Sequence, residues 1–407
     1  MFAIIPFLTN VISPQQNGIL SLFSIFVMFV SPFTLLGFSN SIIIEYSKLD
    51  KKEYASFFTS SLLLSTISFL ILLALFLMFG DTITILVGAP QKLLFWGLLY
   101  AYGNVYFEGI LAYLRVVDRP TTYFCVSIGK SAFELGLVIW LVIIARQGAE
   151  GKVLASLAGA IAIFIFALLY FIKQGLLAKV IRKKYILLEI RFGLSQIFFL
   201  LNLCVLSVAD KYMIEHVLHD TAGLGIYFVA NQLAFIINVL VNAFFHSYQP
   251  QLYAYLSDLT LENKYRLIKI KYVFSGFLLF CTVMLVLFTP LFYRLFITNT
   301  AYHPGISYVA WNAFGFFFWG LYSLFLGYLF YYRKNNVVIV FSIFSSLICI
   351  VLNYVFIKKF QIMGAAYADL LTYFILFIAI VITVKRVLRL DMPWWDFKKI
   401  FKAKLLG

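Results

Sequence analysis

The stretch Val337–Ile357, VVIVFSIFSSLICIVLNYVFI, contains no Asp, Glu, Lys or Arg. A helix rises about 1.5 Å per residue and the hydrocarbon layer of a bilayer is about 30 Å thick, so about 20 apolar residues cross it. Three further stretches also carry no charge: Tyr54–Phe79, Tyr272–Tyr293 and Gly305–Tyr332. Because a core helix of a soluble protein keeps one polar face, repeated runs of this length predict membrane-spanning helices.

Eleven such runs, and a twelfth that is cut short at the amino end, fill most of the 407 residues. The predicted spans are residues 19–44, 54–79, 93–114, 120–145, 153–172, 192–214, 222–251, 272–293, 305–332, 337–357 and 360–384. Residues 1–12 contain Pro6 and are too short to cross alone. We expect that the true start lies upstream, or that this stretch packs as a half-span. With 63% hydrophobic and 12% charged residues, the composition predicts an all-α polytopic membrane protein of about twelve helices.

Lysine and arginine gather on one side of the predicted spans. That side holds 24 of the 32 basic residues, the other side holds seven, and Lys130 lies inside a span. Because basic residues are enriched in cytoplasmic loops, we expect the richer side, with the basic tail 386–407, to be cytoplasmic. The basic residues lie in short loops between spans, which excludes a nucleic-acid partner.

The second half of the chain repeats the first at an offset of 207 residues. The coinciding pairs are Gly18 and Gly225, Phe38 and Phe245, Tyr46 and Tyr253, and Leu49 and Leu256. Six spans per half is an even number, so both halves enter the membrane from the same side. We therefore predict two six-helix lobes, 1–175 and 191–385, related by a parallel pseudo-two-fold axis and separated by a central cleft. The basic linker 176–190 would lie on the cytoplasmic surface.

Motifs for catalysis and for cofactors are missing. The four histidines show no HExxH spacing, no Walker loop occurs, and no loop is long enough to form a catalytic domain. The four cysteines each fall inside an apolar run without a CxxC pair, so we interpret them as packing residues. The sequence therefore predicts a protein that is not an enzyme and that holds no metal or cofactor.

Ionisable residues within the predicted spans are the first candidate site residues, because charge is costly at membrane depth. The candidates are Glu108, Lys130, Glu134, Arg191, Asp210, Lys211 and Asp369. Lys130 and Glu134 are four residues apart on one helix face and can pair with each other. Each candidate has two interpretations: a structural pair or orientation anchor, or the lining of a hydrated cleft.

A polar stripe is the second candidate. Asn231, Asn238, Asn242 and Gln249 recur on one face of the span 222–251, with His246 beside them. Such a stripe forms hydrogen bonds between helices or faces a wet cleft. The sequence leaves both interpretations open.

Several segments resemble one family of transporters. They are LTNVISPQQNG at 8–18, EYSKLD at 45–50, RFGLS at 191–195, ADKY at 209–212 and GIYFVA at 225–230. The chain is similar, over nearly its whole length, to bacterial polysaccharide (O-antigen-type) flippases of the multidrug/oligosaccharidyl-lipid/polysaccharide (MOP) exporter superfamily. It departs from them in its short first span and in Ser195, which stands where a proline is common.

The resemblance implies that the protein flips an undecaprenyl-pyrophosphate-linked oligosaccharide across the plasma membrane. It implies glycosyltransferases and a polymerase as partners, and no ATP site. The pyrophosphate would need cations, for which Arg191, Lys130 and Lys211 are candidates, and the sugars would need Asn, Gln, Ser and Tyr. The alternatives are an ion-coupled multidrug exporter with acidic cleft groups, a membrane glycan polymerase, or a passive scaffold.

Overall fold

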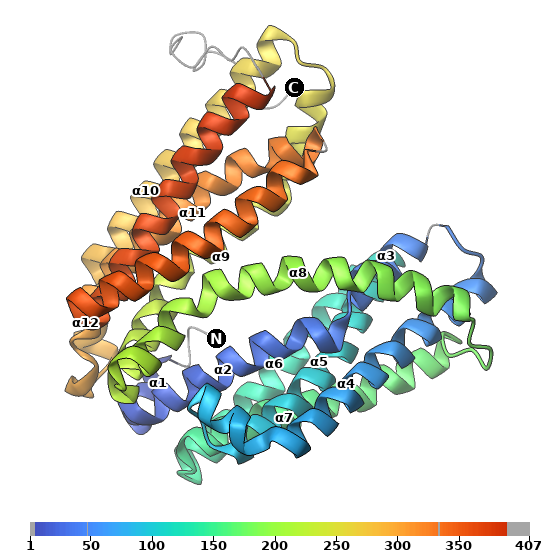
Figure 1. Ribbon diagram of the computed structural model, residues 1–407, viewed down its shortest axis with the longest axis horizontal. Helices are drawn as coiled ribbons and strands as arrows, with labels where there is room; N and C mark the ends of the chain where they lie inside the picture. The colour runs from blue at the N-terminus through green and yellow to red at the C-terminus, as the bar shows by residue number, and fades with distance from the viewer. Residues whose placement is uncertain (1–4, 47, 333, 389–407) are drawn as a thin grey trace. The chain divides into compact units, whose positions relative to one another are not determined.

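The computed structural model describes residues 5–46, 48–332 and 334–388, and these form helices and loops without any strand (Figure 1). The helices of the first half are α1 (Ile5–Val11), α2 (Pro14–Leu35), α3 (Phe38–Tyr46), α4 (Lys51–Val87), α5 (Gln91–Val116), α6 (Pro120–Val138), a π-helix (Ile139–Ile144) and α7 (Gly148–Lys173). Those of the second half are α8 (Lys183–Met213), a π-helix (Ile214–Leu218), α9 (Thr221–Ser257), α10 (Leu261–Phe296), a 3-10 turn (Thr300–Tyr302), α11 (Gly305–Tyr331) and α12 (Asn335–Leu388).

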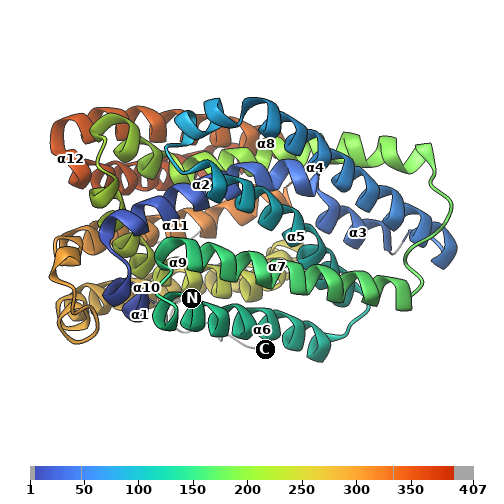
Figure 2. The ribbon, with the colours of Figure 1, turned by 90° about the horizontal axis from the view of Figure 1, so that it is seen from below.

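The chain divides into two compact units within α8. The N-unit runs through Val208, and the C-unit begins at Ala209. In the N-unit α5 packs against α2, α4 and α7, which lie side by side in both views (Figures 1 and 2). In the C-unit α11 packs against α9, α10 and α12. The predicted lobe boundaries and the central cleft stay predictions.

Polar residues at the helix starts fix where the spans begin. Ser13 accepts a hydrogen bond from the backbone of Gln16 while Gln16 reaches back to Ser13, and Pro14 opens α2. Asp50 caps α4 by accepting from the Glu53 amide at 2.7 Å. Each cap satisfies an amide that has no partner within the helix, so these sequences end the loops where they do.

The predicted span 19–44 is broken in the structure. Leu36 (φ 47°) and Gly37 (φ 78°) are left-handed, so α2 ends there and α3 starts at Phe38. Gly193 of α8 packs directly on the Leu36 carbonyl, where a Cβ atom would overlap it. A glycine is therefore required for this close approach between the break and α8.

Helix α12 contains two of the predicted spans. Gln361 has φ 58° and ψ −143°, which breaks the helix. Asn353 donates to Asp369 at 3.4 Å, although 16 residues along a straight helix would separate them by about 24 Å. The chain therefore doubles back at Gln361, as the predicted spans 337–357 and 360–384 require.

The span count agrees with the sequence. Nine helices within the described ranges are long and apolar enough to cross a membrane, and the last of them contains the turn at Gln361. The 26-residue α5 is also long enough to cross. With α12 taken as two spans, this makes the eleven predicted long spans, and α1 has only seven residues. The chain is a multi-pass all-α membrane protein.

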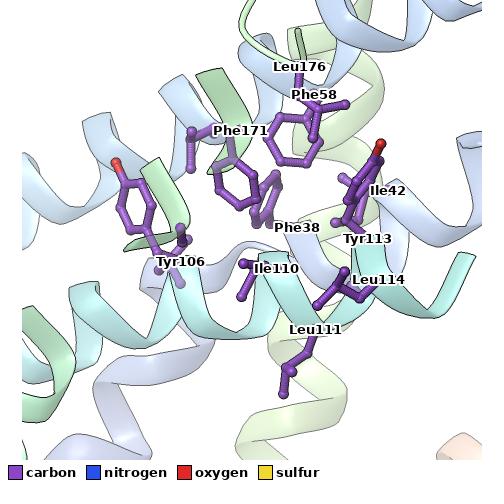
Figure 3. Close-up of a cluster of buried hydrophobic side chains, with 14 of the residues drawn as sticks. Phe38, Ile42, Phe58, Tyr106, Ile110, Leu111, Tyr113, Leu114, Phe171 and Leu176 are labelled. Atoms are coloured by element: carbon purple, nitrogen blue, oxygen red, sulfur yellow. The ribbon is translucent and has the colours of Figure 1, made fainter. Parts of the chain in front are cut away.

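One core cluster of the N-unit is rich in aromatic side chains (Figure 3). Phe58 lies edge-on to Phe38, with ring centroids 5.3 Å apart, and to Phe171 at 4.9 Å. These three side chains join α3, α4 and α7. Because lipid is as apolar as leucine, such packing holds membrane helices together without a hydrophobic driving force between them.

Candidate functional site

Two groups of polar side chains lie at membrane depth, one in each unit. We call them the N-unit cluster and the C-unit cluster. The N-unit cluster contains Tyr100, Asn104, Glu108, Lys130 and Glu134. The C-unit cluster contains Asp210, Lys211, Tyr227, Asn312, Asn353 and Asp369. Six of the ten predicted site residues are charged members of these clusters, three in each.

In the N-unit cluster, α5 presents Tyr100, Asn104 and Glu108 four residues apart, so one helix face carries all three. The Lys130 ammonium of α6 donates to the Asn104 side-chain oxygen at 2.9 Å. It also lies 4.0 Å from the centre of the Phe107 ring, a cation–π contact. The cation is thus held by neutral groups.

The predicted pairing of Lys130 with Glu134 is not a direct contact. No ion pair within 4.0 Å joins them in the described ranges, because the ammonium turns to Asn104. Glu134 and Glu108 still interact with Lys130 electrostatically. All three side chains are half-buried. One partly accessible cation near two carboxylates can exchange partners with an incoming charged group.

A groove runs beside this cluster between α6 and α7. Its volume is about 400 Å³, and Lys130 is the charged residue in its lining. The other lining residues are mostly apolar, among them Phe133, Ile163 and Phe166. An apolar groove with one cation suits a ligand that is part hydrocarbon and part anion.

The C-unit cluster is closed. Lys211 forms an ion pair with Asp210 at 2.9 Å, and the two side chains are 10% and 1% exposed. Tyr227 of α9 donates to Asp369 and is also 3.3 Å from the Asn312 oxygen. Asn353 donates to the other Asp369 oxygen. Four helices therefore meet at one buried network.

The charges of the C-unit cluster do not balance. Asp210 lies within hydrogen-bonding reach of Asp369, so two carboxylates meet out of water. Lys211 supplies one positive charge. Two carboxylates in contact cannot both stay ionised without enough cations nearby, so the second charge is matched by a proton or by a bound cation.

The remaining predicted site residues lie outside the two clusters. Arg191 is exposed on α8 in the N-unit. On α9, Asn231 and Asn238 are half-buried and Asn242 is exposed. The side-chain oxygen of Asn238 is buried and has no hydrogen-bond partner among the described residues. The structure thus spreads the asparagine stripe over a range of exposure.

The sequence did not single out Asn104, Tyr227, Asn312 or Asn353, because one amide or hydroxyl in an apolar span is a weak signal. Glu189 was also missed, since it lies in the predicted linker. The structure places it in α8, fully buried, accepting from Ser41 of α3 at 2.8 Å. A signal was available: Ser41, Ser60 and Ser61 form a small polar set on the facing helices.

The fold is similar to those of a solved transporter and a solved flippase. A multidrug resistance MATE family transporter of the MOP superfamily, in an inward-facing conformation, matches with a TM-score of 0.77 at 14% identity, covering 96% of this chain and 95% of that one. The lipid II flippase MurJ, in an inward closed conformation, matches with a TM-score of 0.69 at 15% identity, covering 99% and 90%. At these identities the matches show the fold alone.

Comparison with curated proteins gave no match. A family model described as "Polysaccharide biosynthesis protein" matches residues 1–253, which is more than half of the chain. These residues include the N-unit cluster, and also Asp210, Lys211 and Tyr227. The chain therefore belongs to the polysaccharide biosynthesis protein family and has the fold of the MOP superfamily transporters.

Proposed function

We propose that this protein is a flippase for an undecaprenyl-pyrophosphate-linked oligosaccharide, used in the assembly of O-antigen, capsule or exopolysaccharide. Membership of the polysaccharide biosynthesis protein family carries the proposal, and the fold supports transport rather than synthesis. The protein is then a transporter and not an enzyme. Its partners are the lipid-linked glycan, membrane lipids, and the glycosyltransferases and polymerase that make and use the glycan.

The N-unit cluster supplies the chemistry that such a substrate needs. Its pyrophosphate is anionic, and Lys130 is a half-buried cation beside an apolar groove. The glycan head group crosses the membrane through a polar path while the prenyl tail stays in lipid. Alternating access, by rocking of one unit against the other, opens the path to each side in turn.

The proposal is tested by replacing the gene with its variants in its own cell. Deletion should remove the surface glycan and leave the lipid-linked oligosaccharide facing the cytoplasm, where an added membrane-impermeant lectin cannot reach it in intact cells. The wild-type gene should restore surface glycan. If the deletion strain exports normal glycan and becomes sensitive to a drug instead, the function is multidrug export.

The C-unit cluster favours an ion-coupled mechanism for either substrate. Its second carboxylate charge must be matched, and a proton or cation that binds there can drive a conformational change. An ion-coupled multidrug exporter is therefore the second candidate function. The two candidates are separated by measuring transport in vesicles with an imposed proton or sodium gradient. Transport of lipid-linked glycan supports the flippase, and transport of a cationic dye supports the multidrug exporter.

The orientation is a separate proposal: a plasma-membrane protein with its linker and carboxyl terminus in the cytoplasm. Lys183 and Lys359 are both exposed, and the charge distribution assigns them to opposite sides. Cysteines placed at these positions should react with an impermeant reagent from opposite faces. Labelling of both from the same face would reject this topology.

A further inference from the structure

A second cavity of the N-unit belongs to neither cluster. It has a volume of about 330 Å³, at the lower end of the usual range for ligand pockets. It lies where α3 ends, α4 begins and α7 passes into its following loop. Its lining residues are Tyr46, Leu49, Lys51, Tyr54, Tyr113, Gln174, Gly175 and Leu176. We call it the tyrosine pocket.

Three tyrosine rings form its wall. The ring of Tyr46 stands perpendicular to that of Tyr54, with centroids 5.1 Å apart, and nearly perpendicular to that of Tyr113 at 6.5 Å. Tyr46 is 39% exposed, whereas Tyr54 and Tyr113 are buried. Figure 3 shows Tyr113 at the border of the aromatic core. Tyr54 and Tyr113 belong to the core behind the pocket, and the Tyr54 hydroxyl donates to the Ile42 carbonyl at 3.3 Å, so these two rings are held in place.

The charge at the pocket is positive. Lys51 lines it, and Arg119 lies close enough to donate to Tyr170, whose ring is 6.4 Å from that of Tyr113. The three neighbouring acids are already engaged: Glu45 with Lys48, Glu53 with Arg182, and Asp50 as the cap of α4. Within the described part of the chain, Lys51 therefore has no carboxylate at ion-pair distance.

The pocket is formed in advance and open. The loop that carries Gly175 and Leu176 is held on α4, because Thr59 donates to the Leu176 carbonyl at 3.1 Å and accepts from the Ala178 amide at 2.8 Å. Gly175 has φ 67° and open space on its side-chain face. No loop ordering is needed before a ligand enters, which lowers the cost of binding.

We propose that the tyrosine pocket binds a phosphate ester that carries hydroxyl groups, at the membrane surface. The Lys51 ammonium meets the phosphate, while the hydroxyl of the exposed Tyr46 and the Gln174 amide meet the hydroxyl groups. Two sources share this chemistry: the glycerophosphate head group of an anionic phospholipid and the sugar phosphate head group of the lipid-linked glycan. Binding there requires no translocation, so the inference goes beyond the proposed function.

The test is direct binding to the purified full-length chain in phosphatidylcholine nanodiscs. The probes are dioctanoyl phosphatidylglycerol and a short-prenyl pyrophosphoryl hexose. Lys51→Gln should weaken binding of the preferred probe by about tenfold, which corresponds to the loss of one charge-assisted hydrogen bond. The matched control is Lys52→Gln, an exposed neighbour outside the pocket lining, which should bind as the wild type does. Because the helix dipole opposes lysine in a first turn, Lys51→Gln should fold normally.

A second variant keeps the charge and fills the cavity. Leu49→Trp should lose binding to a similar extent as Lys51→Gln. Tighter binding of the pyrophosphoryl hexose identifies the substrate head group, and tighter binding of phosphatidylglycerol identifies the phospholipid. Equal affinity of the wild type and both pocket variants for each probe would overturn the proposal, as would an equal loss in Lys52→Gln.

A separate measurement of surface glycan distinguishes failure of this inference from failure of the proposed function. If Lys51→Gln loses binding but exports glycan normally, the pocket stands and its ligand is not needed for export. If the wild-type gene fails to restore glycan to a deletion strain, the flippase proposal fails while the binding result is unaffected.

Discussion

The two units hold the same charges at membrane depth and bury them differently. Each cluster has two carboxylates and one lysine. In the N-unit all three are half-buried, and the lysine bonds to a neutral amide beside a groove. In the C-unit Asp210, Lys211 and Asp369 are each less than 10% exposed as residues and belong to a network that joins four helices. We infer that the N-unit cluster meets a large ligand and the C-unit cluster only a proton or small ion.

Among the variants that test this comparison, we expect the largest effect at Lys211. Lys211→Met should leave Asp210 and Asp369 in contact without a neighbouring cation and should cost about 3 kcal/mol of unfolding free energy. The double variant Lys211→Met/Asp210→Asn should recover most of that loss. Thermal unfolding in detergent measures both. Equal loss in the single and double variants would show that the lysine acts through packing alone.

At Lys130 the effect should fall on transport instead. Lys130→Ala should abolish surface glycan while the amount of protein in the membrane stays unchanged. Unfolding free energy should fall by about 1 kcal/mol, the worth of one hydrogen bond. Quantitative glycan staining and membrane immunoblots check this, with the exposed neighbour Ser131→Ala as a control. Normal export by Lys130→Ala would contradict the inference that the N-unit cluster meets the transported ligand.

Arg191 lies outside both clusters, is exposed, and stands at the start of a predicted span. It therefore tests whether a cation outside the clusters also serves the ligand. If it serves the anionic head group, Arg191→Ala should abolish glycan export and Arg191→Lys should keep part of it. Protein level should be the same in both. If both variants export as the wild type does, the charge is only an orientation anchor.

The smallest expected effect is at Asn238. Its side-chain oxygen is buried without a partner in the described structure, so Asn238→Leu should change stability by less than about 1 kcal/mol. If the stripe lines the transport path, the same variant should reduce flipping, and Asn242→Leu should do so too. A variant that melts earlier but exports at the normal rate would show that the stripe joins helices.

Span number and helix class could be predicted from the sequence because charge-free runs of 20 residues have one stable solution in lipid. The helix boundaries were less predictable. The break at Leu36 and Gly37 lies inside an apolar run, and α8 begins at Lys183, within the predicted linker. Positive φ angles and helix extensions into basic segments depend on tertiary contacts, such as that of Gly193 with Leu36, which no local pattern contains.

For the candidate sites, the sequence identified charges but not their partners. Asp210, Lys211 and Asp369 were found because ionisable residues stand out in apolar spans. Their bonding to Tyr227 and Asn353 depends on which helices meet. The Lys130 side chain had a predicted partner four residues away and instead bonds to another helix. Intrahelical spacing gives candidates for pairing, and tertiary packing selects among them.

Helix α8 has a consequence for protein engineering. It runs unbroken from Lys183 to Met213 across the boundary between the two units, and its first half fits the N-unit through Glu189 and Gly193. A cut in the loop before Lys183 would strip the N-unit of these contacts, and a cut at Val208 would split a helix. Neither unit should therefore be produced alone from a simple truncation. Split versions of this transporter should work only if the α8 segment is supplied whole with the N-terminal fragment.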